Sequence, residues 1–132
     1  MWWAQYIGIP FLELGRDKSG CDCWGLVRIV YEEQLGVALP SWSAHKSLSD
    51  RALVREELEE AHKLFEKVDE PEPFALVLAS SSLTVLHVGI AVDSNMMLHT
   101  TKGKDACIER WSVLEKQLKG FYRYHDQSCR PT

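Results

Sequence analysis

Residues 22–36 read DCWGLVRIVYEEQLG, and this stretch carries the clearest helix signal in the chain. Apolar side chains recur at helical spacing from Trp24 to Leu35. Asp22 stands where an N-cap residue satisfies the first free amides of a helix, and Gly36 supplies a stop. We therefore expect one well-defined helix with Cys23 on its first turn.

The segments around this helix fall into two types. Upstream, residues 2–9 suggest a short amphipathic helix that stops before Pro10, and residues 15–20 suggest a loop. Downstream, residues 50–67 combine an apolar stripe with a strongly charged face, which predicts a second helix. This helix lies within residues 41–72, which we interpret as a helical insertion and possible docking surface.

The second half of the chain has the pattern of strands. Apolar and β-branched segments are separated by serine-rich and Asp-Ser-Asn turns. The predicted strands are residues 74–79, 84–92, 96–101, 107–111 and 121–125, with a short helix at 113–119. Helices followed by a mostly antiparallel sheet define the α+β class.

Length and composition restrict the possible functions. A chain of 132 residues with 45% hydrophobic residues forms one core, so we expect a single domain over 1–132. The net charge is -4 and the basic residues are scattered along the sequence, so we expect no basic surface that would bind nucleic acid. The apolar stretches are too short for membrane insertion, and the N-terminus lacks the features of a signal peptide. We expect synthesis in the cytoplasm, and delivery by another carrier if the protein works outside the cell.

The four cysteines are expected to be free thiols, because no export signal places them in an oxidising compartment. A zinc site built from Cys21, Cys23, His87 and His99 is chemically possible, although a Cys-x-Cys spacing is unusual for zinc. Our prediction is therefore that the chain uses no metal and no other cofactor.

Cys23 is the candidate nucleophile. At the first turn of a helix, peptide dipoles and unpaired amides favour the thiolate, so we expect a lowered pKa for Cys23. Its own backbone N–H can contribute to an oxyanion hole. Cys21 precedes the helix and lacks this advantage.

His87 and His99 are the candidates for the general base and its orienting partner. If Asp93-Ser94-Asn95 forms a three-residue hairpin loop, Gly89 is opposite His99, and the two histidines are diagonal neighbours on one face. A loop of even length would put them on opposite faces. Taken singly, each residue also has a structural interpretation: a cysteine is often a small buried hydrophobe, and a strand histidine often only packs.

Three motifs together resemble the NlpC/P60 family. They are the Asp-Cys-x-Gly-Leu-Val sequence at 22–27, the His-x-Gly-Ile sequence at 87–90, and a histidine twelve positions after the first. The stretches at 22–28 and 120–123 look similar to the phage-tail and gene-transfer-agent branch. Two family features are missing: a Gly-Asp pair before the first core strand, and a tyrosine near the oxyanion, where Phe11 falls.

The resemblance implies a papain-like fold and a cysteine peptidase with a Cys23-His87-His99 triad. It implies hydrolysis of the bond between D-glutamate and a diamino acid in peptidoglycan stem peptides. Asp22, Trp24 and Tyr6 are candidate substrate-binding residues. A phage tail or tail-tip component fits best, with peptidoglycan and neighbouring tail-tip proteins as partners and the virion tail or a tail-like particle as location. The alternatives are a tail-tip assembly protein with little activity and a bacterial housekeeping hydrolase, which we disfavour.

Overall fold

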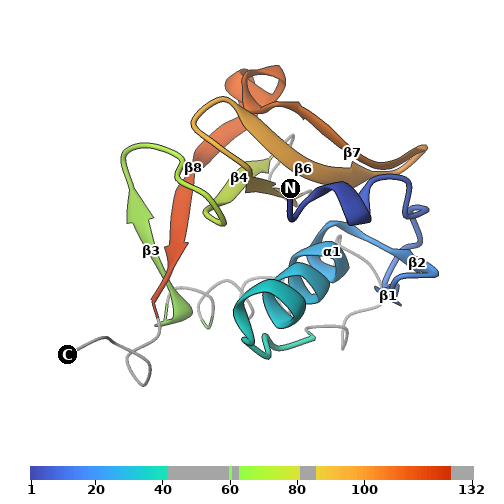
Figure 1. Cartoon of the computed structure of the whole chain (residues 1–132). Helices are drawn as coiled ribbons and strands as arrows, with labels where there is room; N and C mark the ends of the chain where they lie inside the picture. Colours follow the sequence, from blue (N-terminus) through green and yellow to red (C-terminus); the bar gives the residue numbers. More distant parts are fainter. Residues whose placement is uncertain (42–59, 61–62, 81–85, 126–132) are drawn as a thin grey trace.

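The computed structural model describes residues 1–41, 60, 63–80 and 86–125. Its centre is a six-stranded antiparallel sheet in the spatial order β3-β8-β4-β5-β6-β7. Helix α1 (Cys23–Val30) lies against one face of this sheet (Figure 1). The strands are β3 (Phe65–Val68), β4 (Leu76–Ser80), β5 (Leu86–Ala91), β6 (Met96–Thr101), β7 (Lys104–Arg110) and β8 (Leu118–Tyr124). The predicted α+β class is confirmed.

Helix α1 begins at the predicted cap, and helical backbone continues beyond α1 to the predicted stop at Gly36. The Gly25 N–H donates to Oδ1 of Asp22 at 2.8 Å, so Asp22 caps the helix. The helix continues as a π-helical turn, η2 (Tyr31–Leu35). Gly36 then adopts a left-handed conformation with φ of 67°, which glycine accepts without strain.

The sheet has an apolar core on each face. Val88 and Leu98 pack with the apolar side chains of α1 on the first face. Ala91 and Met97 belong to a second cluster with Phe121, bordered by the 3-10 helix η3 (Trp111–Gln117). Since side chains alternate along a strand, β5 and β6 place their histidines on this second face.

The N-terminal segment differs from its predicted form. Within residues 2–9 the only helix is the 3-10 turn η1 (Ala4–Tyr6), because Ile7 is extended and the backbone turns at Gly8 with φ of 95°. The Gly8 N–H then donates to the Ala106 carbonyl at 2.8 Å, which ties the segment to β7. Residues 15–20 are not a plain loop, since β1 (Arg16–Asp17) and β2 (Gly20–Cys21) form a small hairpin.

The end of the helix predicted over 50–67 is a strand in the structure. Residues 65–67 lie in strand β3, which pairs with β8 through Phe65 and Tyr124. The rings of Phe65, Tyr124 and Tyr31 contact one another edge to face, and this packing overrides the helical period. Residues 42–59 and 61–62 lie outside the described residues, as does most of the predicted charged face. The short helix expected at 113–119 is η3.

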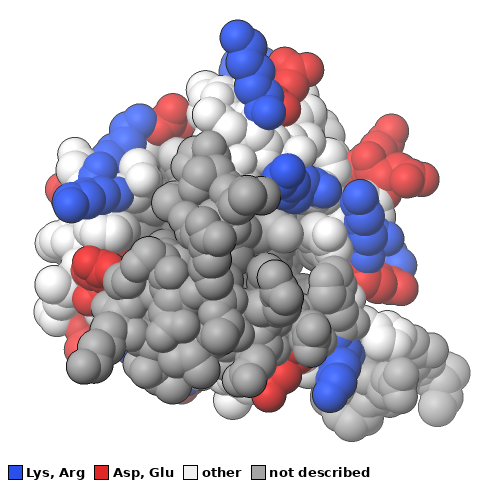
Figure 2. Space-filling model, turned by 180° about the vertical axis from the view of Figure 1, so that it is seen from behind, with Lys and Arg blue, Asp and Glu red and all other residues white. Residues whose placement is uncertain are grey.

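Charged side chains of both signs lie together on the surface. Figure 2 shows lysine and arginine next to aspartate and glutamate around the rim of the back face. Arg123 and Glu66, for example, pair at 2.6 Å across β8 and β3. In the described part of the chain, no helix combines the length and the apolar character needed to cross a membrane.

Gly25 provides a test of how the helix N-terminus is packed. A Cβ at Gly25 would lie 2.1 Å from the Gly15 carbonyl oxygen, a backbone atom that cannot turn away. We expect Gly25→Ala to lower the free energy of unfolding by at least about 1–3 kcal/mol through overpacking. Helix propensity alone predicts that the free energy of unfolding rises by about 1 kcal/mol. The sign of the measured change therefore shows which of the two effects is larger. Urea denaturation measures it, and an unchanged or higher midpoint would show that Gly15 does not lie so close.

Candidate active site

The sulfur of Cys23 lies against strand β5. The backbone N–H of Val88, the residue after His87, acts to lower the pKa of this thiol, so the sulfur lies near this part of β5. The β5–β6 ladder joins Ile90 to Leu98 and Ala91 to Met97, and in this register Val88 would be opposite Thr100. The Val88 N–H instead meets the thiol, so the start of α1 contacts the sheet beside His87.

His87 and His99 form a direct contact. Nε2 of His87 lies 2.9 Å from Nδ1 of His99, and the two rings meet edge to face. Val92 donates to the carbonyl of Met96, as the three-residue loop predicts, and the ladder continues in that register. The space beside Gly89 is tight, because a Cβ there would lie 2.9 Å from Sδ of Met97 and 3.3 Å from Cβ of His99. The predicted hairpin register is confirmed.

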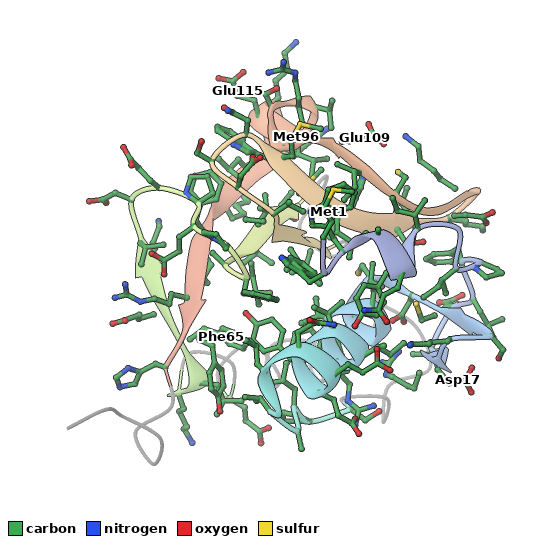
Figure 3. The ribbon with its side chains drawn as sticks, viewed as in Figure 1. Met1, Asp17, Phe65, Met96, Glu109 and Glu115 are labelled. Atoms are coloured by element: carbon green, nitrogen blue, oxygen red, sulfur yellow. The ribbon has the colours of Figure 1, made fainter. Side chains whose placement is uncertain are left out.

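Glu109 on β7 extends this contact into a chain of three residues. Nε2 of His99 lies 3.1 Å from Oε1 of Glu109, which also accepts a hydrogen bond from Nζ of Lys104. Figure 3 shows Glu109 on the side of β7 away from α1. Sequence reasoning missed Glu109, because its place beside His99 depends on the β6–β7 pairing.

The charges along this chain fix where the protons lie. The Lys104 ammonium lowers the pKa of Glu109 to about 2, so its carboxylate is ionised and only accepts hydrogen bonds. Burial lowers the pKa of His99, so its ring is neutral. Nε2 of His99 must then carry the proton, Nδ1 of His99 accepts from Nε2–H of His87, and Nδ1 of His87 is left as a free lone pair.

The expectation of a lowered pKa for Cys23 is wrong. Burial raises the pKa of Cys23 to about 11, and the opposing effects of the backbone amides of Val88 and Trp24 do not offset it. Burial also lowers the pKa of His87 to about 4. The resting pair is therefore a neutral thiol and a neutral imidazole rather than a thiolate and an imidazolium.

Two of the three candidate substrate-binding residues have structural roles here. Tyr6 is 0% exposed, and its hydroxyl bonds to Glu33 and Gln34. Asp22 is 7% exposed, and its oxygens accept from Gly25, from Arg16 and from the backbone of residue 14. These contacts give Tyr6 and Asp22 structural roles, and substrate contact by either residue stays a prediction.

Trp24 is partly buried beside Cys23, and its indole N–H donates to the Pro40 carbonyl at 2.8 Å. This hydrogen bond orients the ring at the first turn of α1, so Trp24 remains a candidate substrate contact. Phe11 pairs with Cys21 through an isolated bridge, which places it beside the start of the same helix.

The described cysteines Cys21, Cys23 and Cys107 are all free thiols. Cys21 is fully buried in the core beside α1, which gives it the role of a small hydrophobe. Among the described residues, the side chains close enough to share a metal ion are His99, Cys107 and Glu109. Of the zinc alternative that the sequence offered (Cys21, Cys23, His87 and His99), this set contains only His99.

Comparison with known proteins now places the chain in a family. The NlpC/P60 family model matches residues 8–122, and the chain belongs to that family. It is 26% identical over 106 residues to murein DD-endopeptidase MepS/murein LD-carboxypeptidase of Escherichia coli, covering 80% of this chain and 50% of that protein. The chain thus spans about half the length of the curated relatives it matches.

Two solved structures share the fold. An NLP/P60-family protein from Staphylococcus aureus, described as similar to a lipoprotein, aligns with a TM-score of 0.68 and 21% identity over 95% of this chain and 40% of that one. The NlpC/p60 domain of the peptidoglycan hydrolase SagA aligns with a TM-score of 0.63 and 23% identity over 92% of this chain and 91% of that one. Both support the predicted α+β, papain-like fold of the NlpC type.

Proposed function

We propose that this protein is a cysteine peptidase that hydrolyses stem peptides of peptidoglycan, with Cys23 as nucleophile, His87 as general base and His99 as its orienting partner. The observation that carries the proposal is the meeting of two features at β5. The thiol at the start of α1 lies near the backbone N–H of Val88, and the preceding residue, His87, begins the hydrogen-bonded chain to His99 and Glu109. Family membership and the printed functions of the relatives support the same chemistry.

The proposed reaction uses the free lone pair on Nδ1 of His87. This atom takes the thiol proton as Sγ of Cys23 bonds to the carbonyl carbon, and the N–H of Cys23 stabilises the oxyanion. The imidazolium then gives its proton to the leaving amine as the C–N bond breaks, which leaves a thioester. Water hydrolyses the thioester with His87 again as base, and the thiol is restored.

The two pKa shifts predict the pH dependence of kcat/KM. Activity needs neutral His87, whose pKa is lowered to about 4, and neutral Cys23, whose pKa is raised to about 11. Kcat/KM should therefore stay level through the neutral range and fall in acid only as pH approaches about 4. Rates are measured where circular dichroism shows the fold intact. An acid limb near the ordinary histidine value of about 6.5 would contradict a buried, neutral His87.

The bond we propose is the one between D-glutamate and the diamino acid. The E. coli relative is named for DD-endopeptidase and LD-carboxypeptidase activity, so these two bonds are the direct competitors. Purified chain is incubated separately with a stem tripeptide, a tetrapeptide and a cross-linked dimer, and mass spectrometry identifies the new ends. Release of a free diamino acid amine from the tripeptide supports our assignment. Cleavage of the cross-linked dimer or of the terminal D-residue alone would replace it.

We also propose that the domain acts in a phage tail or tail-like particle, where it opens the cell wall locally. The support is the resemblance of the segments at 22–28 and 120–123 to that branch. A particle carrying Cys23→Ala discriminates this from an assembly role. Particles that form normally but infect poorly through an intact wall support the enzyme. Loss of particles, or full infectivity, would favour the assembly protein.

A further inference from the structure

The hydrogen-bonded chain ends in a group of side chains that the proposed hydrolysis does not use fully. His99 and Cys107 are directly opposite each other on β6 and β7, and Glu109 follows two residues after Cys107 on the same face. One nitrogen, one sulfur and one oxygen from this group all lie within 4.8 Å of one another. The group is defined here as the His99-Cys107-Glu109 cluster.

We propose that this cluster binds a borderline-soft divalent cation such as Zn²⁺, and that the bound ion switches off the His87 base. The ligand types are those that zinc prefers. Zinc–ligand bonds of about 2.0–2.3 Å at tetrahedral angles hold ligand atoms about 3.3–3.8 Å apart. The observed separations are 3.1 Å from Nε2 of His99 to Oε1 of Glu109 and 3.5 Å from Sγ of Cys107 to that oxygen.

The cluster is both rigid and accessible. Its members stand on two paired strands, so little reorganisation is needed to bring the three atoms around an ion. Cys107 and Glu109 are partly exposed, which gives an ion and a fourth, water ligand a route in. Lys104 now bonds to Glu109, but its side chain is 50% exposed and can turn into solvent.

The ion would act through the proton positions on the two histidines. Without it, Nε2 of His99 donates to Glu109, and Nδ1 of His87 has the free lone pair. With the ion on Nε2 of His99, the proton of that neutral ring must move to Nδ1, which then donates to Nε2 of His87. The His87 proton moves to its Nδ1, so the atom meant to accept the Cys23 proton is blocked. Binding also releases the Cys107 thiol proton to water.

Binding is tested first, without any dependence on activity. Zn²⁺ is titrated into the Cys23→Ala protein in competition with a chromophoric zinc chelator. We expect about one ion per chain, and affinity at least about tenfold weaker after Cys107→Ser is added. Serine keeps a hydroxyl donor for Glu109 but is a poor zinc ligand. Equal affinity with and without Cys107→Ser would overturn the site, as would equal binding of Mg²⁺.

The switch is tested by the tautomer of His87 and by inhibition. In the Cys23→Ala protein, ¹⁵N shifts of the His87 ring should change from an Nε2–H to an Nδ1–H pattern when zinc binds. Unchanged shifts with zinc bound would overturn the switch.

The inhibition arm rests on the proposed peptidase function. Zinc should inhibit the wild type reversibly, and Cys107→Ser should need at least about tenfold more zinc, each rate being compared with its own zinc-free value. Equal inhibition of both would place the ion at Cys23 and His87 instead. An inactive wild type would refute the peptidase while leaving the binding result intact.

Discussion

Replacing Cys23 with alanine should lower kcat on stem peptides by about 10⁴- to 10⁶-fold, because an alanine side chain cannot form the thioester. Its thiol is the only one among the described residues that combines the first turn of a helix with a contact beside His87. The loss should appear in kcat, since binding surfaces are unchanged. Initial rates on the tripeptide measure it.

The matched control for Cys23→Ala is Cys129→Ala, which changes a cysteine outside all three family motifs. Its rate should equal that of the wild type. Thermal unfolding of both variants shows that the fold persists. A Cys23→Ala protein that keeps more than about a tenth of the wild-type kcat would show that the thiol is not the nucleophile.

His87→Ala should be almost as damaging as Cys23→Ala, because the thiol is neutral in the resting protein and needs a base. His99→Ala should keep about 100-fold more activity than His87→Ala, since the third member of a triad orients the base and does not transfer the proton. Both effects are read from kcat on the same tripeptide.

A conservative variant separates orientation from packing at His99. In His99→Asn the side-chain carbonyl can accept from Nε2–H of His87, so it should recover activity relative to His99→Ala. A merely structural loss would not be recovered in this way. If His99→Ala proved worse than His87→Ala, the two roles would have to be exchanged.

Local rules predicted the elements that carry the site. The Asp22 cap and the Gly36 stop depend on residues within one turn of the helix ends, and both are as expected. The three-residue loop after Val92 fixes the pairing of the two strands and therefore which of their residues share a face. Counting residues back from the loop along each strand then predicts the His87–His99 contact.

The features that sequence reasoning missed depend on residues far apart in the chain. Residues 65–67 continue the helical pattern predicted over 50–67, yet they pair with β8 more than fifty positions later. Glu109 joins His99 only through the β6–β7 register, which shifts between His99 and Thr101. The pKa of Cys23 is raised because folding buries its thiol. The position of Cys23 at a helix N-terminus can be recognised in the sequence, but the extent of this burial cannot.

The central claim is covalent catalysis by Cys23, and partitioning of the thioester tests it most directly. Tripeptide is hydrolysed in rising concentrations of hydroxylamine, and mass spectrometry follows the two products that contain the acyl group. The account predicts that a hydroxamate replaces the free carboxylic acid in proportion to hydroxylamine, and that Cys23→Ala forms neither product. Amine release by the wild type without hydroxamate at any concentration would contradict it, because water would then attack the substrate directly.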